Sequence, residues 1–178
     1  MTNTYFISQI FTILGIILLG SSYLCKNKRE ILILSLLSSI CYGSHNFLLG
    51  AITGFAMNIV TIILNLWLYI NEKNKKQTSS KLLFSICLIT IILGSISYQN
   101  IFSLLPIIAS LLFTYSIWQN NNKVYRWIGL LTSILWLSYN TYLNSIFGII
   151  TEIILLGFKV VGLIKVIRIN DKHIFKKR

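Results

Sequence analysis

Long apolar runs separated by short polar breaks are the feature that most constrains this chain of 178 residues. A helix that crosses a bilayer needs about 20 mostly apolar residues. Two joints, at Gly50 and at 144–145, are tight, and we split the runs there because an unbroken helix would be about 40 residues long, twice what a bilayer requires. The sequence therefore predicts an all-α membrane protein with seven spanning helices, over residues 5–24, 31–49, 51–70, 82–98, 101–119, 124–143 and 145–167.

The composition agrees with a lipid environment. Hydrophobic residues make up 55% of the chain and charged residues only 11%. A water-soluble domain of this size could not hide so much apolar surface, so the lipid bilayer is the expected partner. Residues 1–4 carry no basic residue and no clear small-residue cleavage site follows, so we interpret 5–24 as a first span and not as a signal peptide.

The positive charges predict the orientation of the chain. The formal net charge is +12, and the charges sit in four clusters between the apolar runs. Because cytoplasmic loops are rich in lysine and arginine, this pattern places the N-terminus outside and the C-terminus in the cytoplasm. Separate clusters do not form one continuous basic face, so no nucleic-acid partner is expected. The clusters follow the first, third, fifth and seventh runs, at Lys26, Lys28 and Arg29, at Lys73, Lys75, Lys76 and Lys81, at Lys123 and Arg126, and from Lys165 to Arg178.

An internal repeat divides the chain. Residues 36–59 align with residues 130–153 without a gap, at an offset of 94, and the matches include polar and glycine positions. Such a repeat predicts two similarly oriented three-helix units, an architecture of small-solute transporters. The expected division is a first unit over 1–72, a linker with the fourth helix over 73–99, a second unit over 100–169, and a basic cytoplasmic tail over 170–178 that binds anionic lipid head groups.

Three segments carry a resemblance to known proteins: CYGSHNFLLG (41–50), LLPIIASLLFTYSIW (104–118) and WLSYNTYLNSIFGIITE (136–152). With the 3+1+3 arrangement, they resemble the SWEET and PQ-loop carriers and, more closely, the bacterial inner-membrane proteins called YgjV. The resemblance implies a multi-pass protein of the bacterial inner membrane, built from two three-helix units around a central solute site.

The SWEET pattern has an aromatic residue on the second helix of each unit and an asparagine about 16 residues later on the third. Here Tyr42 precedes Asn58 by 16 residues, and Trp136 precedes Glu152 by the same distance. Because Glu152 stands where the family has asparagine, amino acids and vitamin precursors stay open as substrates beside sugars. Thr12 stands in the first unit where the second has Pro106, and neither is followed by glutamine.

Glu152 is the strongest candidate for a functional side chain. It lies about 10 Å below the outer end of the seventh run. An ionisable group at that depth is costly and usually faces a cavity or a partner, so we predict substrate binding or proton coupling, with a structural buried acid as the alternative. Lys159 lies seven residues on, on the same helical face. It either forms a zwitterion-binding or charge-relay site with Glu152 or, as the two-turn separation favours, extends to the cytoplasmic interface.

Aromatic and polar residues share one face on each second helix. Tyr42, His45 and Asn46 are spaced by three and four residues, as are Trp136, Tyr139 and Asn140. Two such faces that meet across a pseudo-two-fold axis would form an aromatic-walled chamber with polar tips, although ordinary helix packing is the alternative. The predicted substrate-binding residues are Tyr42, Asn46, Asn58, Trp136, Asn140 and Glu152.

Pro106 is expected in the middle of the fifth helix, where the loss of a backbone hydrogen bond would produce a kink that acts as a hinge or a static bend. The predicted function is a carrier for a small polar solute, with a non-transporting scaffold or receptor as the alternative. No enzyme, cofactor or metal site is expected, because the three cysteines and two histidines are scattered and no carboxylate pair or nucleophile–base pair is present. The sequence leaves a homo-oligomer open.

Overall fold

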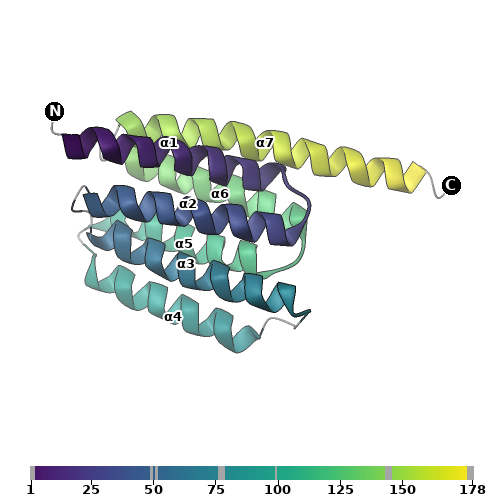
Figure 1. Ribbon diagram of the computed structural model, residues 1–178, viewed down its shortest axis with the longest axis horizontal. Coiled ribbons are helices and arrows are strands. Elements are labelled where there is room, and N and C mark those ends of the chain that lie inside the picture. The colour runs from purple at the N-terminus through teal and green to yellow at the C-terminus, as the bar shows by residue number, and fades with distance from the viewer. Residues whose placement is uncertain are drawn as a thin grey trace.

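The computed structural model describes residues 3–48, 50, 52–75, 79–98, 100–142 and 146–175 (Figure 1). Within these ranges the chain forms seven α-helices and one short 3-10 helix, and no strand. The prediction of seven helices is confirmed, and most boundaries lie within a few residues of those expected. The elements are α1 (Asn3–Leu24), α2 (Lys28–Leu48), α3 (Ile52–Lys73), α4 (Ser80–Ile96), η1 (Ile101–Ser103), α5 (Leu104–Trp118), α6 (Asn122–Tyr142) and α7 (Ile146–Phe175).

Several helices are long and apolar enough to cross a membrane. Five segments in the described ranges meet both conditions, and α4 is apolar but shorter, at 17 residues. Helix α6 is less apolar because its first turns carry Lys123, Arg126 and several amide or hydroxyl side chains. The chain therefore passes the membrane several times. The five segments are Thr4–Leu24, Lys28–Leu48, Phe55–Lys73, Ile101–Trp118 and Phe147–Ile167.

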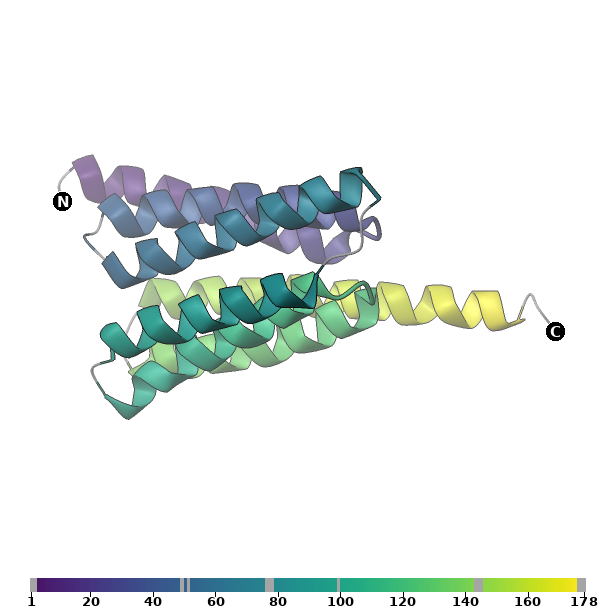
Figure 2. The same cartoon turned by 90° about the horizontal axis from the view of Figure 1, so that it is seen from below.

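The helices form two layers, with α1 to α3 in one and α4 to α7 in the other (Figure 2). Helix α2 packs between α1 and α3, and α6 packs between α5 and α7, so the order within each three-helix group is the same. The layers meet where α1 packs on α7 and where α3 packs on α4 and α5. Any side chain that α1, α2, α6 or α7 turns toward the opposite layer therefore lies in the interior of the bundle. We call the layers the first half (α1–α3) and the second half (α4–α7).

The turn at the first tight joint is as expected. Gly50 has a φ of 70°, a left-handed conformation that glycine adopts without steric cost. It ends the connection between α2 and α3 and confirms that the run is two helices and not one. The second joint, at 144–145, lies outside the described residues. Helix α7 continues to Phe175, beyond the expected end at 167, so the first residues of the predicted tail are helical.

The expected position of Pro106 is wrong. Helix α5 begins at Leu104, directly after η1, so Pro106 is its third residue. In the first turn of an α-helix the backbone N–H groups have no partner within the helix, and proline is tolerated there. Pro106 therefore does not interrupt the middle of α5. The predicted kink lacks its physical cause, because no interior hydrogen bond is lost.

Candidate functional site

Polar side chains share the interior of the bundle with an apolar core that includes Leu32, Leu64 and Leu68, whereas many other large apolar side chains face outward. Phe6, Phe84 and Ile96 are among the many exposed apolar residues. In lipid, apolar groups gain nothing by turning inward, and polar groups must find partners inside the protein. The described polar residues that are buried come from both halves and include Ser22, Ser35, Asn65, Arg126, Ser133, Glu152 and Lys159.

One acid, one hydroxyl and one ammonium form a chain at the centre of the second half. Glu152 and Lys159 lie two turns apart on α7 and are 9% and 3% exposed. Ser133, on α6, donates a hydrogen bond from Oγ to Glu152 Oε2 at 2.7 Å. Lys159 Nζ in turn donates to Ser133 Oγ. The serine hydroxyl therefore links the two charged groups, which we call the Glu152–Ser133–Lys159 cluster.

The cluster also contacts the first half through Tyr23 of α1. Lys159 Nζ lies 5.0 Å from the centroid of the Tyr23 ring, a cation–π contact. The Tyr23 ring stacks on Tyr125 of α6, with centroids 4.6 Å apart, and Tyr125 Oη lies 2.9 Å from Ser22 Oγ. Lys159 is thus held between α1, α6 and α7. The expectation that its side chain extends to the cytoplasmic interface is wrong, because α7 turns this face toward the interior and Ser133 is within reach.

Tyr42 of α2 reaches the same region from the first half. Its ring packs on Gly15 of α1, where an added Cβ would lie 3.0 Å from the ring. The Tyr42 hydroxyl is buried and has no hydrogen-bond partner among the described residues, and it interacts electrostatically with Glu152. A buried hydroxyl without a partner costs free energy, so this group is a candidate for binding a solute or water. Two of the predicted site residues, one from each layer, thus interact electrostatically, and no hydrogen bond joins them among the described residues.

The other predicted site residues are half-buried, and three of them, Asn58, Trp136 and Asn140, pack on the same or a neighbouring helix. Asn58 of α3 packs against Gly43 of α2, and Asn140 of α6 packs against Gly148 of α7. Trp136 makes an edge-to-face contact with Tyr139, with centroids 6.0 Å apart. In the part of the chain that the structure describes, no hydrogen bond joins Asn46, Trp136 or Asn140 to Glu152. Their role in binding stays a prediction.

His45 is bound to α1 and not to the cluster. Its Nδ1 lies 2.8 Å from Thr12 Oγ1 and 3.0 Å from the Ser8 carbonyl oxygen. The sequence reasoning missed two members of the central arrangement, Ser133 and Tyr23. For Ser133 a signal was present, because it is matched by Ser39 within the aligned repeat segments.

A second polar network joins the two halves at the basic end of the bundle, where the α1–α2 and α5–α6 connections meet. Lys28 Nζ donates to the carbonyl oxygens of Trp118 and Gln119, both at 2.8 Å, and to Asn120 Oδ1 at 2.6 Å. In the opposite direction, Asn122 Nδ2 donates to the Lys26 carbonyl oxygen at 2.5 Å. The two connections are therefore bound to each other by reciprocal hydrogen bonds.

Arg126 completes this basic-end network. Arg126 is 0% exposed. Its Nε donates to the Tyr23 carbonyl oxygen at 2.8 Å, and another nitrogen of its guanidinium group donates to the Cys25 carbonyl oxygen. These carbonyls stand at the carboxyl end of α1, where the helix dipole favours a cation. The network closes this end of the bundle between the halves.

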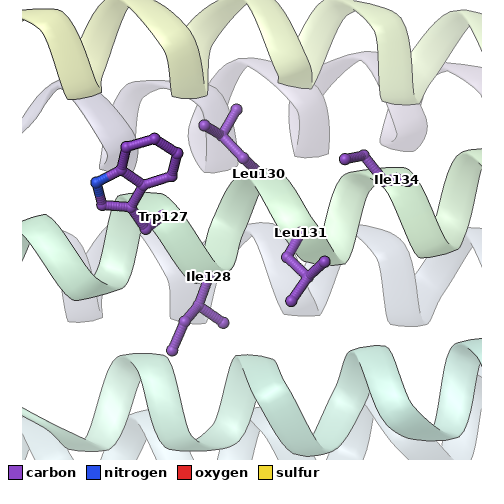
Figure 3. Close-up of a pocket in the computed structure, with 5 residues that line it drawn as sticks. All are labelled: Trp127, Ile128, Leu130, Leu131 and Ile134. Carbon is purple, nitrogen blue, oxygen red and sulfur yellow. The ribbon is translucent and has the colours of Figure 1, made fainter.

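A groove of about 400 Å³ lies along α6, away from the cluster (Figure 3). Five side chains of this one helix line it, and they are apolar apart from the indole nitrogen. Such a groove suits a lipid chain better than a polar solute, and it contains none of the predicted substrate-binding residues. Its lining residues are Trp127, Ile128, Leu130, Leu131 and Ile134.

Comparison with known proteins gives one match. A family model described as Imp-YgjV, bacterial inner membrane protein, matches residues 6–170, which is nearly the whole chain. No curated protein and no solved structure matches the chain. Among the described residues, no group of three histidine, cysteine, aspartate or glutamate side chains lies where it could hold a metal ion.

Proposed function

Since this chain belongs to the Imp-YgjV family and is a multi-pass protein of the bacterial inner membrane, we propose that it is a carrier for a small polar solute. The observation that carries the proposal is the buried Glu152–Ser133–Lys159 cluster, and the Tyr42 hydroxyl of the facing half, which is buried without a hydrogen-bond partner among the described residues, supports it. Ionisable groups inside a membrane protein are costly, and they commonly mark solute or ion pathways.

The proposed site lies between the two halves. Tyr42 comes from the first half and Glu152 from the second, so a rocking motion of one half against the other would open the site to one side of the membrane at a time. This alternating access follows from the repeat that we propose for 1–72 and 100–169. The proposed orientation, with the N-terminus outside, places the basic-end network at the cytoplasmic side.

In this account the basic-end network is the contact that must break when the site opens to the cytoplasm. Lys28 and Asn122 cross-link the two connections there, and Arg126 binds the end of α1. Glu152 is the candidate for proton coupling, because protonation would remove its charge from a site that Lys159 shares. We propose no catalytic activity.

The alternative is a scaffold or receptor that uses the same fold without transport. This alternative is supported by Ser133 and Lys159, because both side chains have hydrogen-bond partners within the bundle. A scaffold, however, gains nothing from leaving the Tyr42 hydroxyl without a partner.

The test is a thermal-stability screen of the purified protein against sugars, amino acids, nucleosides and vitamin precursors, at pH 5.5 and 7.5. A solute at 100 times its dissociation constant adds about 2.7 kcal/mol to the free energy of unfolding. A carrier is stabilised by one solute class, and Glu152→Gln loses that response or its pH dependence. Glu30→Gln, an exposed acid on α2, is the control and keeps both. Hits are then tested for uptake into proteoliposomes, and binding without uptake would favour the receptor.

A further inference from the structure

The charges in the cluster constrain the chemistry of the solute. The cluster contains one acid and one base, Glu152 and Lys159, so with both ionised it has no net charge. The other deeply buried cation, Arg126, is bound to carbonyl oxygens at the carboxyl end of α1. The charge of Arg126 is therefore compensated separately, and the net charge of the cluster depends on Glu152 and Lys159 alone.

We propose that the solute is zwitterionic, with an ammonium group that binds Glu152 and a carboxylate that binds Lys159. This inference rests on the proposed carrier function and names its substrate class.

The spacing of the two charged groups supports this assignment. Glu152 and Lys159 are joined through a single hydroxyl oxygen, at 2.7 Å from the carboxylate. Within the described ranges, no direct ion pair connects them. The ammonium and carboxylate of an amino acid are separated by a similarly short distance, so one small molecule can contact both side chains at once. The solute then replaces the Ser133 bridge with two hydrogen bonds in which both the donor and the acceptor are ionised, whereas each bond to Ser133 has one ionised partner.

Charge balance disfavours solutes with a net charge. Such a solute would leave one buried charge without a partner, which costs more free energy than a compensated pair. A sugar is neutral, but its hydroxyl groups could only repeat what Ser133 already does. A zwitterion is the class that keeps the site neutral and gains contacts with both ions.

Tyr42 supplies a third contact. Its hydroxyl oxygen is buried without a hydrogen-bond partner among the described residues, and we assign it as an acceptor for the ammonium group. Lys159 lies two turns farther along α7, toward the basic end of the bundle. The solute is therefore oriented, with its carboxylate toward the end that the basic-end network closes.

The experiment measures binding of matched probes to the purified full chain, from the concentration dependence of its melting temperature. The probes are alanine, serine and glutamine, the amide of each, which lacks the anion, the N-acetyl derivative of each, which lacks the cation, and glucose. The proteins are the wild type, Glu152→Gln, Lys159→Met and the double variant. Lys165→Met, an exposed cation on the same helix, is the control. The double variant leaves no unpaired charge, so it keeps the test valid if Lys159→Met alone does not fold.

The expected result is that at least one free amino acid stabilises the wild type and Lys165→Met, with an apparent affinity at least tenfold higher than that of its amide and N-acetyl derivative. The same probe should lose at least tenfold in affinity with Glu152→Gln and should not stabilise the double variant. Stabilisation by glucose alone would overturn the zwitterion and leave the carrier standing. A response that survives in the double variant would place binding elsewhere and overturn the assignment. Both the zwitterion and the carrier would be overturned if no probe stabilises the protein at 100 times a millimolar dissociation constant and no solute does so in the wider screen.

Discussion

Asn65 in the first half and Lys159 in the second half stand 94 residues apart and do the same structural task with different chemistry. Asn65 is 0% exposed and donates from Nδ2 to Ser35 Oγ on α2 at 3.1 Å. Lys159 donates to Ser133 Oγ on α6. Each third helix is thus joined to its second helix by a buried donor on a serine. The first half uses a neutral amide, and the second uses a cation that also needs an acid.

The comparison shows that, of these two positions, only the one in the second half carries the free-energy cost of a buried charge. A neutral buried hydrogen bond adds about 0.5–1.5 kcal/mol to stability. Removal of one partner from a buried ion pair costs about 3–5 kcal/mol, because the other charge is left uncompensated. A fold that needed only helix packing could use the chemistry of the first half twice. The charged version in the second half is therefore the part that we assign to function.

The largest effect is expected from Lys159→Met. The change leaves Glu152 buried beside Ser133 with no cation, and we expect a loss of about 3–5 kcal/mol in the free energy of unfolding. Chemical unfolding in detergent, followed by circular dichroism, gives the value. Lys165→Met, at an exposed position of α7 where Nζ has one exposed hydrogen bond of 3.4 Å to the Leu24 carbonyl oxygen, should stay within about 0.5 kcal/mol of the wild type. Equal losses in the two variants would mean that α7 responds to any lost lysine.

A second effect tests whether α7 carries the contact between the halves. A Cβ at Gly162 would overlap the Tyr23 carbonyl oxygen of α1, and a backbone atom cannot turn away. Gly162→Ala should therefore cost about 1–3 kcal/mol, the usual range for overpacking.

Gly157→Ala is the matched control for this prediction. It lies on the same helix with no neighbour within 4 Å of an added Cβ, and it should be neutral or stabilising by up to about 1 kcal/mol. Both values come from the same unfolding measurement. A tolerated Gly162→Ala would show that α1 and α7 can separate without cost.

A smaller effect is expected from Asn65→Leu in the first half. The variant loses one neutral hydrogen bond, but it also removes the buried Asn65 Oδ1, which has no partner among the described atoms. The two contributions oppose each other, so we expect a loss of about 1 kcal/mol or less. A loss as large as that of Lys159→Met would erase the distinction between the halves.

The smallest effect is expected from Pro106→Ala, at another pair of positions 94 residues apart. Thr12 lies well inside α1, whereas Pro106 is in the first turn of α5. Replacement of a proline in a helix interior should stabilise by about 3 kcal/mol, but in the first turn the change should stay within about 0.5 kcal/mol. The melting temperature decides between the two. A large stabilisation would mean that Pro106 interrupts a helix interior and would support the kink that the sequence predicted.

The number of helices could be predicted from the sequence because the length of an apolar run is a property of the sequence alone. The partner of Lys159 could not be predicted in this way. Its spacing from Glu152 placed both residues on one face, but whether that face meets lipid or Ser133 depends on how α7 is rotated against α6. The position of Pro106 failed for a related reason, since η1 takes the residues that were assigned to the start of the fifth helix.

Arg126 shows the same limit at the basic end. Its sequence context, beside Lys123 after an apolar run, predicted a charge on the cytoplasmic side. In the structure it is fully buried, because the end of α1 offers carbonyl oxygens that accept from its guanidinium group. Charge counting gives the side of the bundle on which a cation lies, but its partner depends on how the two halves meet.

A double-mutant cycle between Glu152→Gln and Lys159→Met tests most directly whether these residues form one compensated pair. The free energies of unfolding of the wild type, both single variants and the double variant are measured under the same detergent conditions. We expect the double variant to recover most of the stability that Lys159→Met loses, with a coupling of about 2 kcal/mol or more. Losses that add within about 0.5 kcal/mol would mean that the two residues act independently and would contradict the charged site.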